Sequence, residues 1–234
     1  MLMRIVKISA QRPDLKIIAE AARVIRNGGL VIFPTETVYG LGADAFNARA
    51  VARIFIAKGR LEGKPLIVHM AKKSTIAELA QGIPLVAHKL ARKFWPGPLT
   101  LVLKAKKRMP AQVAGIFKAT SKLPSLEVLR NKVGGKTVTT RTVAVRMPDH
   151  AVARALIMAA GPIAAPSANF SGEPPPRSIK EIPKALLEKA DLVLDAGPTT
   201  VKVPSTVLDL TIKPPAILRQ GAIPWVRLKR IGQW

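Results

Sequence analysis

Cysteine is absent from this chain of 234 residues, and acidic side chains are scarce, with 14 Asp and Glu against 38 Lys and Arg. Without cysteine, the chain can form no disulfide, no thiolate nucleophile and no thiolate metal site. The three histidines are scattered and form no H-E-x-x-H motif, so a histidine-rich zinc site is also disfavoured. We therefore expect any chemistry to depend on cations, hydroxyls and backbone groups.

Other features are missing as well. One Tyr, six Phe and three Trp are too few for the rows of stacked aromatics that bind single-stranded nucleic acids. Every apolar run is interrupted by a charge or a proline, and the N-terminus lacks the apolar core of a signal peptide, so we expect a cytoplasmic protein without membrane contact. The sequence also lacks a Walker A motif and a G-x-G-x-x-G turn.

The charge balance is strongly positive, with a formal net charge of +24. Such a surplus predicts attraction to polyanions, including RNA, nucleotides and phosphorylated substrates. The alternative is a lysine-rich solvated surface suited to a hot or salty cytoplasm.

The pattern of apolar residues predicts a single α/β domain over residues 1–234, with a twisted, mixed (parallel and antiparallel) open sheet flanked by helices. Asp14 and Asn47 are expected N-caps of two helices, and Thr75 with Glu78 forms a possible capping box. Strands are expected near 30–33, 65–70, 99–103, 142–147, 163–168, 191–197, 205–210 and 216–221.

Residues 104–141 interrupt this pattern. The segment is basic, and only 125–133 shows a weak helical period. We expect a long surface excursion that carries a short helix, because a connection of this length is usually functional or mobile. It could be a lid or an RNA-binding addition.

Two polar stretches lie near the ends of expected strands, where open α/β sheets place their ligands. "PTETVYG" offers the hydroxyls of Thr35, Thr37 and Tyr39, although a capped turn would explain them equally well. "AKGRLEGKPLIVH" offers three cations within seven residues, which could bind a polyphosphate. The dipole at a helix end is a purely structural reason for Lys58, and His69 could be an ordinary core residue.

Two further polar stretches follow later strands. In "APSANFSG", small neighbours would let a ligand approach the backbone near Ser167 and Asn169, although an ordinary turn is the alternative. "VPSTVLDL", followed by "LRQG", supplies Ser205, Thr206 and Arg219. Each stretch is weak evidence alone, and their joint occurrence in this order raises the probability of a site.

Seven stretches together resemble the YrdC-type threonylcarbamoyl-AMP synthases over roughly residues 13–224. They are "FPTETVYGLGADAFN", "KGRLEGKPLIVH", "FWPGPLTLVL", "TVAVRMPDH", "GPIAAPSANFSGEP", "PSTVLDL" and "ILRQGAI". The resemblance implies a YrdC-like fold with a large basic cavity. It also implies synthesis of L-threonylcarbamoyladenylate from L-threonine, bicarbonate or CO₂, and ATP, with release of pyrophosphate. This is the first step of N6-threonylcarbamoyladenosine (t6A) formation in tRNA, which a threonylcarbamoyl transferase partner protein completes.

The resemblance also implies roles for individual residues. The catalytic and phosphate-binding cations would be Lys58, Arg60 and Lys64, with Mg²⁺ accompanying ATP and no protein metal ligand assigned. Ser167, Asn169 and Arg219 would complete the ATP site. The threonine side would comprise Thr35, His69, Thr142 and Ser205, with Tyr39 and Arg146 as further candidates.

The sequence departs from the family where "PPPR" replaces a Ser-Pro-Thr-like turn after "SANFSGE", so contacts of that turn cannot be carried over. Two alternatives remain open. The chain could be a module that binds tRNA or double-stranded RNA without forming an adenylate. It could instead be a carbamoyl-transfer relative of hydrogenase-maturation proteins, but those are longer and carry zinc-finger-like cysteines.

Overall fold

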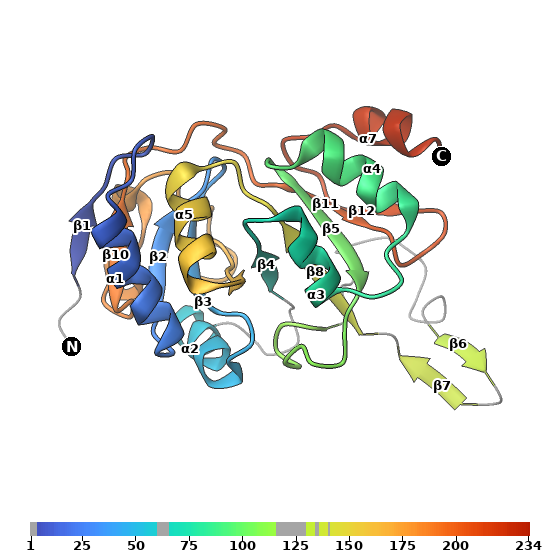
Figure 1. The fold of residues 1–234 in the computed structure, drawn as a ribbon, viewed down its shortest axis with the longest axis horizontal. Helices are drawn as coiled ribbons and strands as arrows, with labels where there is room; N and C mark the ends of the chain where they lie inside the picture. Colours follow the sequence, from blue (N-terminus) through green and yellow to red (C-terminus); the bar gives the residue numbers. More distant parts are fainter. Residues whose placement is uncertain (1–3, 60–65, 116–129, 134–135, 140) are drawn as a thin grey trace.

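A ten-stranded mixed sheet forms the centre of the molecule (Figure 1). The computed structural model describes residues 4–59, 66–115, 130–133, 136–139 and 141–234. The strands lie in the order β1-β10-β2-β3-β9-β4-β8-β5-β11-β12. Their bounds are β1 Ile5–Lys7, β2 Val31–Pro34, β3 Tyr39–Asp44, β4 Ile67–His69, β5 Leu99–Lys104, β8 Thr142–Arg146, β9 Ile163–Ala164, β10 Leu192–Asp195, β11 Thr206–Asp209 and β12 Ala216–Arg219.

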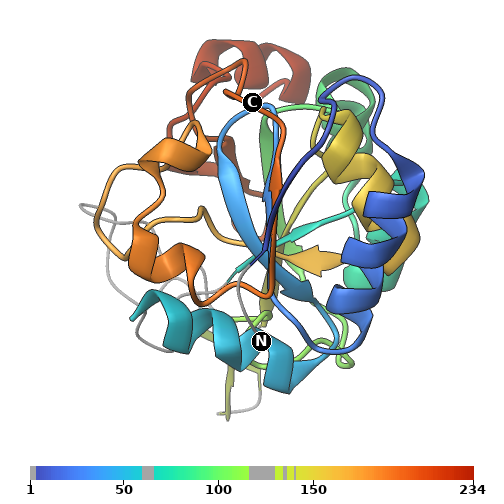
Figure 2. The same cartoon turned by 90° about the vertical axis from the view of Figure 1, so that its left-hand side faces the viewer.

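Helices lie on both sides of the sheet (Figure 2). They are α1 Leu15–Arg26, α2 Ala48–Lys58, α3 Ile76–Leu79, α4 Leu85–Phe94, α5 Ala151–Ala160, α6 Lys184–Leu187 and α7 Trp225–Gly232, with 3-10 turns η1 Lys73–Thr75 and η3 Ile179–Glu181. Asp14 accepts a hydrogen bond from Lys16 N, and Asn47 accepts one from Ala50 N, so both expected N-caps are confirmed.

Alternation along the strands separates two hydrophobic cores. On β2, Val31 and Phe33 pack with α1 and α5, whereas the residue between them, Ile32, packs with α2 on the other face. On β5, Leu101 likewise belongs to the larger core, which also contains residues of α4 and α7. Its neighbour Val102 points the opposite way, into a third, small cluster with Ala144 and Val207.

The expected α/β class and mixed sheet are confirmed, but several local expectations are wrong. Thr75 makes no side-chain capping bond, so the proposed capping box does not form. In the described part of 125–133, Arg130–Val133 is strand β6, which pairs with β7 Lys136–Thr139 in a separate two-stranded sheet, and not the expected helix (Figure 1). Strands β1 and β3 and helix α7 were not expected.

No helix among the described residues is both long and apolar enough to cross a membrane.

Candidate active site

One face of the sheet carries most of the polar candidates, and we call it the polar face. Strand register places His69 of β4 opposite Arg146 of β8, and Arg146 opposite Thr100 of β5. Paired residues point to the same side of a sheet, as do residues two apart on one strand. The polar face therefore includes Ile67, His69, Thr100, Val102, Lys104, Thr142, Ala144, Arg146, Ser205, Val207, Asp209 and Arg219.

Arg146 lies at the centre of this face and is almost fully buried. Its Nη2 donates to Thr37 Oγ1 at 2.9 Å, and its Nε donates to the carbonyl of Gly97 at 3.3 Å. Nη2 also lies 2.7 Å from Glu36 Oε1, and both side chains of this ion pair are about 95% removed from solvent, with relative exposures of 4% and 6%. A buried guanidinium needs such a counter-charge, because an unpaired charge in the interior is costly.

Glu36 is a functional candidate that sequence reasoning missed. The ion pair with Arg146 is close, but within the described residues neither carboxylate oxygen accepts a hydrogen bond. The backbone around it is fixed, because its carbonyl accepts from Val201 N at 2.8 Å. The sequence feature that could have identified Glu36 is a carboxylate between two threonines in the middle of an apolar stretch, in a chain with very few acids.

The hydroxyls of "PTETVYG" are organised locally. Thr35 Oγ1 lies 2.9 Å from Thr37 Oγ1 and donates to the carbonyl of Val38 at 2.7 Å. Tyr39 faces the core, and its hydroxyl donates to Gly197 O at 2.6 Å while accepting from Ala196 N. Burial raises the pKa of Tyr39 to about 12, so its phenol stays protonated. Thr35 and Thr37 thus lie beside Arg146, while Tyr39 anchors strand β3.

His69 is neutral in the folded protein. It is 4% exposed, and burial followed by the charge of Arg146 lowers its pKa to about 3. The ring meets Phe33 edge-on at a centroid distance of 6.2 Å, and its Nδ1 has no hydrogen-bond partner among the described residues. A neutral imidazole beside a guanidinium can donate or accept a hydrogen bond but adds no charge.

Lys58 joins two segments that are far apart in the sequence. It is the last residue of α2, and Gly59 follows in the left-handed conformation with φ of 55°. The side chain is 2% exposed, and its Nζ donates to the carbonyl of Ser167 at 2.6 Å and to the carbonyl of Asn169. The helix dipole alone would leave this lysine in solvent, so the structure gives it a more specific role.

The Ser167–Asn169 turn is held in one conformation. Ser167 Oγ donates to Asn169 Oδ1 at 2.5 Å, and Asn169 Nδ2 donates to the carbonyl of Glu173 at 2.6 Å. The turn lies beside β3, because Ala168 N donates to the carbonyl of Tyr39. Lys58 and strand β3 therefore meet at this turn.

Ser205 and Arg219 form a second cluster on the polar face. Ser205 Oγ lies 2.8 Å from Thr100 Oγ1, and Arg219 Nη2 donates to the same Ser205 Oγ at 3.0 Å. Burial among protein atoms and then the charge of Arg146 lower the pKa of Arg219 to about 10. Part of the residue remains exposed at the sheet edge, so Arg219 stays a cation at neutral pH.

Thr142 completes the polar face at the other end of β8, where its Oγ1 donates to the carbonyl of Gly115 at 2.7 Å. Arg60 and Lys64 lie outside the described residues. The structure thus brings Thr35, His69, Arg146, Ser205 and Arg219 around one face and links Lys58 with Ser167 and Asn169. Thr100 was also missed, since a threonine inside "LTLVL" reads as part of an apolar strand.

Comparison with known proteins identifies relatives along nearly the whole chain. The chain is 44% identical over 212 residues to the threonylcarbamoyl-AMP synthase of Pyrococcus abyssi and 43% identical over 209 residues to that of Bacillus subtilis. These matches cover 90% and 88% of this chain but only 56% and 54% of the relatives. The chain therefore spans about half the length of these curated relatives.

A solved structure and a family model agree with these matches. The crystal structure of P. abyssi Sua5 complexed with L-threonine superimposes with a TM-score of 0.81 at 42% identity, covering 97% of this chain and 60% of that one. The model of the Sua5/YciO/YrdC family, described as telomere recombination, matches residues 23–221. The expected resemblance is confirmed, and this chain belongs to the Sua5/YciO/YrdC family.

Proposed function

We propose that this chain synthesises L-threonylcarbamoyladenylate from L-threonine, bicarbonate or CO₂, and ATP, and releases pyrophosphate. The observation that carries the proposal is the polar face, where two guanidiniums, a neutral histidine and several hydroxyls converge. The similarity to threonylcarbamoyl-AMP synthases, one of which has been solved with L-threonine, supports the choice of substrates. The product would serve t6A formation in tRNA.

The proposed reaction has two bond-forming steps. The α-amine of threonine attacks the carbon of CO₂ and loses a proton, which gives a carbamate. A carbamate oxygen then attacks the α-phosphorus of ATP, the bond to the β-phosphate breaks, and pyrophosphate leaves. Negative charge accumulates around phosphorus during this step, so cations that are already in position provide most of the assistance.

The roles of the described residues follow from their surroundings. Lys58 would hold the Ser167–Asn169 turn and bring its positive charge to the phosphates. Arg60 and Lys64 are proposed as further phosphate ligands on the family resemblance alone. Arg219 would bind the nucleotide from the edge of the sheet. On the threonine side, Arg146 would meet the amino-acid carboxylate through Nη1, because Nε and Nη2 already contact Gly97, Thr37 and Glu36.

Neutral partners would complete the threonine side. Thr35, Thr142 and Ser205 supply hydroxyls, and His69 supplies an uncharged imidazole. A neutral ring avoids repulsion with Arg146 and suits a hydrogen bond to the hydroxyl or carboxylate of the substrate. A large basic cavity over this face, as the family resemblance implies, is part of the proposal.

Mg²⁺ is expected to arrive with ATP. Among the described residues, no three His, Asp or Glu side chains are grouped as metal ligands would be. We treat Mg²⁺ as part of the MgATP substrate, held by phosphates and water.

The proposal is tested by incubating the protein with ATP, Mg²⁺, bicarbonate and threonine, and measuring pyrophosphate and the adenylate together. Equal amounts of both products, with neither formed when threonine or bicarbonate is omitted, would support it. Pyrophosphate release that is indifferent to threonine would contradict it. A protein that binds RNA but forms no adenylate would favour the alternative of a binding module.

A further inference from the structure

The carboxylates of Asp209 and Glu36, which lie on or against the polar face, differ in how their oxygens are used. Asp209 Oδ1 accepts hydrogen bonds from the amide and the hydroxyl of Thr211, each at 2.7 Å. The side chain of Glu36 is only 6% exposed, yet neither of its oxygens accepts a hydrogen bond from any described residue. A buried carboxylate without donors is costly, so we expect its donors to come from a bound ligand or a water molecule.

The ion pair with Arg146 balances the charge of Glu36 but does not use its lone pairs. Oε1 lies 2.7 Å from Arg146 Nη2, which instead donates to Thr37 Oγ1 at 2.9 Å. An ionised carboxylate has about four lone-pair sites, so acceptor capacity remains after the ion pair has formed. The main chain here is fixed, because Val201 N and Thr200 Oγ1 both donate to the carbonyl of Glu36. The loop therefore cannot simply shift to find other donors.

Opposite charges side by side suit a ligand that carries both charges. In an α-amino acid, the ammonium and the carboxylate are attached to the same carbon. With the substrate carboxylate on Arg146 Nη1, as proposed above, the ammonium comes next to Glu36. A metal ion would bind only the carboxylate of this pair, and no three His, Asp or Glu side chains of the described chain are grouped as its ligands. An ammonium group, with three N–H donors, fits the unused acceptors better.

We propose that Glu36 binds the α-ammonium group of L-threonine. This rests on the proposed function and adds to its threonine side a residue that selects for the amine. One proton leaves the ammonium before its nitrogen attacks CO₂ and a second leaves afterwards, both to water, so the carbamate keeps one N–H. The nitrogen can therefore donate to Glu36 before and after the carbon–nitrogen bond forms. Glu36 thus holds the nitrogen in place during carbamate formation.

The test compares L-threonine with its 2-hydroxy analogue of the same configuration, in which a hydroxyl replaces the ammonium. Isothermal titration calorimetry without ATP or Mg²⁺ measures both affinities for the wild type and for Glu36→Gln. The wild-type preference for threonine should fall by about tenfold, the difference between a charged and a neutral hydrogen bond. Any effect that passes through Arg146 cancels in this ratio, because both ligands keep the carboxylate.

A second variant guards against a loss of folding, which circular dichroism would detect. Glu36→Asp keeps the counter-charge of Arg146 but withdraws the carboxylate by one methylene, so the preference for threonine should fall here as well. The matched control is Glu78→Gln, because Glu78 forms an exposed ion pair with Arg108 at 3.3 Å. This control should keep the wild-type preference within twofold.

Equal weakening of both ligands in the Glu36 variants would overturn the proposal, because Glu36 would then act only through Arg146. No weakening of either ligand would also overturn it, and would leave a buried water as the partner of Glu36. A wild-type protein that forms the adenylate but binds the hydroxy analogue as tightly as threonine would contradict this proposal alone. A wild-type protein that binds neither ligand and forms no adenylate would contradict the proposed function.

Discussion

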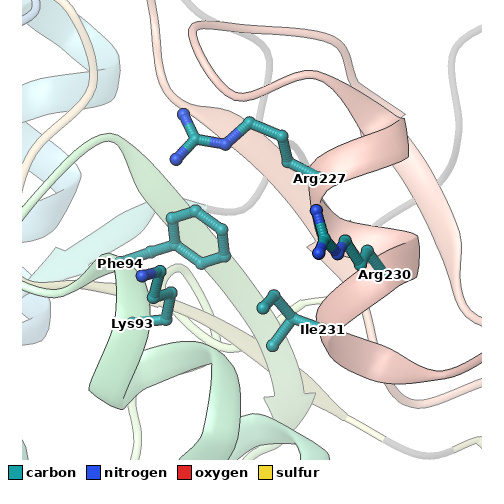
Figure 3. A pocket seen from close by; sticks show the side chains of 5 residues that line it. All are labelled: Lys93, Phe94, Arg227, Arg230 and Ile231. Carbon is teal, nitrogen blue, oxygen red and sulfur yellow. The ribbon is translucent and has the colours of Figure 1, made fainter.

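Two groups of cations in this molecule have the same charge but opposite environments. Lys58 and Arg146 are buried, and their positions are fixed by hydrogen bonds to carbonyls and a hydroxyl and by the ion pair of Arg146 with Glu36. Lys93 and Arg230 line a pocket between α4 and α7, together with Phe94, Arg227 and Ile231, which we call the α4–α7 pocket (Figure 3). Both cations are exposed and form no ion pair among the described residues. A fixed cation can assist a reaction at a defined atom, whereas an exposed one contributes mainly a salt-sensitive attraction. Net charge alone does not distinguish them.

The largest expected effect is the loss of adenylate synthesis in Lys58→Ala. This change removes the charge and two hydrogen bonds that hold the Ser167–Asn169 turn. Adenylate synthesis should fall by roughly 10²–10³-fold, the size seen when a preorganised electrostatic group is lost. Steady-state rates check this, with urea unfolding to show that the fold remains cooperative. Lys189→Ala, at an exposed lysine, is the control, and equal rates for the two variants would refute the role of Lys58.

Breaking the buried ion pair between Glu36 and Arg146 should have the next largest effect, on the free energy of unfolding. Glu36→Gln leaves the guanidinium of Arg146 without its counter-charge, and should lower the free energy of unfolding by about 3 kcal/mol. The matched control is Glu188→Gln, because Glu188 forms a solvent-exposed pair with Lys184 at 3.9 Å and should cost less than about 0.5 kcal/mol. Urea denaturation compares the two, and similar losses would mean that burial does not strengthen the pair.

Features that depend on residues close together in the sequence could be predicted. Asp14 and Asn47 are capping residues whose effect depends on neighbours a few positions away, so their helices were predicted correctly. Family motifs indicated Lys58, His69 and Ser205 as candidates. The pairing of Glu36 with Arg146 was not predictable from local pattern, because it joins a residue of the loop after β2 to a residue of β8 more than 100 positions away.

The alternation of apolar and polar residues along a strand could have predicted further residues of the polar face. Thr100 and Arg146 each lie on a strand whose neighbouring residues face the large core, and a polar side chain in such a position indicates the opposite face. The α4–α7 pocket could not be predicted from the sequence, because helix α7 itself was not predicted. The stretches that supply the two helices, 79–126 and 210–234, contain no Asp or Glu, but only tertiary packing brings α4 and α7 together.

A pH-dependent effect should follow from His69. Its pKa is about 3 in the folded protein and near 6.5 in the unfolded chain, so the unfolded chain binds one more proton between these values. This makes the free energy of unfolding decrease as pH falls below about 6.5, by up to about 1.4 kcal/mol per pH unit. Between pH 7 and pH 5, His69→Gln should therefore lose about 2 kcal/mol less than the wild type.

Urea unfolding at pH 7, 6 and 5 measures this difference. Burial also lowers the pKa of His150, but that residue is retained in both proteins, so its contribution cancels. His88→Gln, at an exposed histidine on α4, is the control and should leave the pH dependence unchanged. If His69→Gln shows the wild-type dependence, His69 is not held neutral by burial.

Arg219→Lys should have a smaller effect. Arg219 contacts both Ser205 O and Ser205 Oγ through its guanidinium fork, and a lysine ammonium cannot reproduce that geometry. The charge is retained, so we expect the KM for ATP to rise by about tenfold, or 1.4 kcal/mol, with little change in kcat. Lys213→Ala, at an exposed lysine before β12, is the control. A change in kcat alone would place Arg219 in the chemical step rather than in nucleotide binding.

The smallest effect on stability and synthesis is expected from the exposed cations. Arg227→Gln removes the contact with Phe94, which is worth about 0.5–1 kcal/mol at an exposed site. Arg230→Gln removes an exposed charge with no ion pair among the described residues, so it should change the free energy of unfolding by less than about 0.5 kcal/mol. Both variants should synthesise the adenylate within twofold of the wild-type rate. A loss of synthesis as large as that of Lys58→Ala would show that the α4–α7 pocket and the polar face act as one site, because only then would an exposed cation matter as much as a buried one.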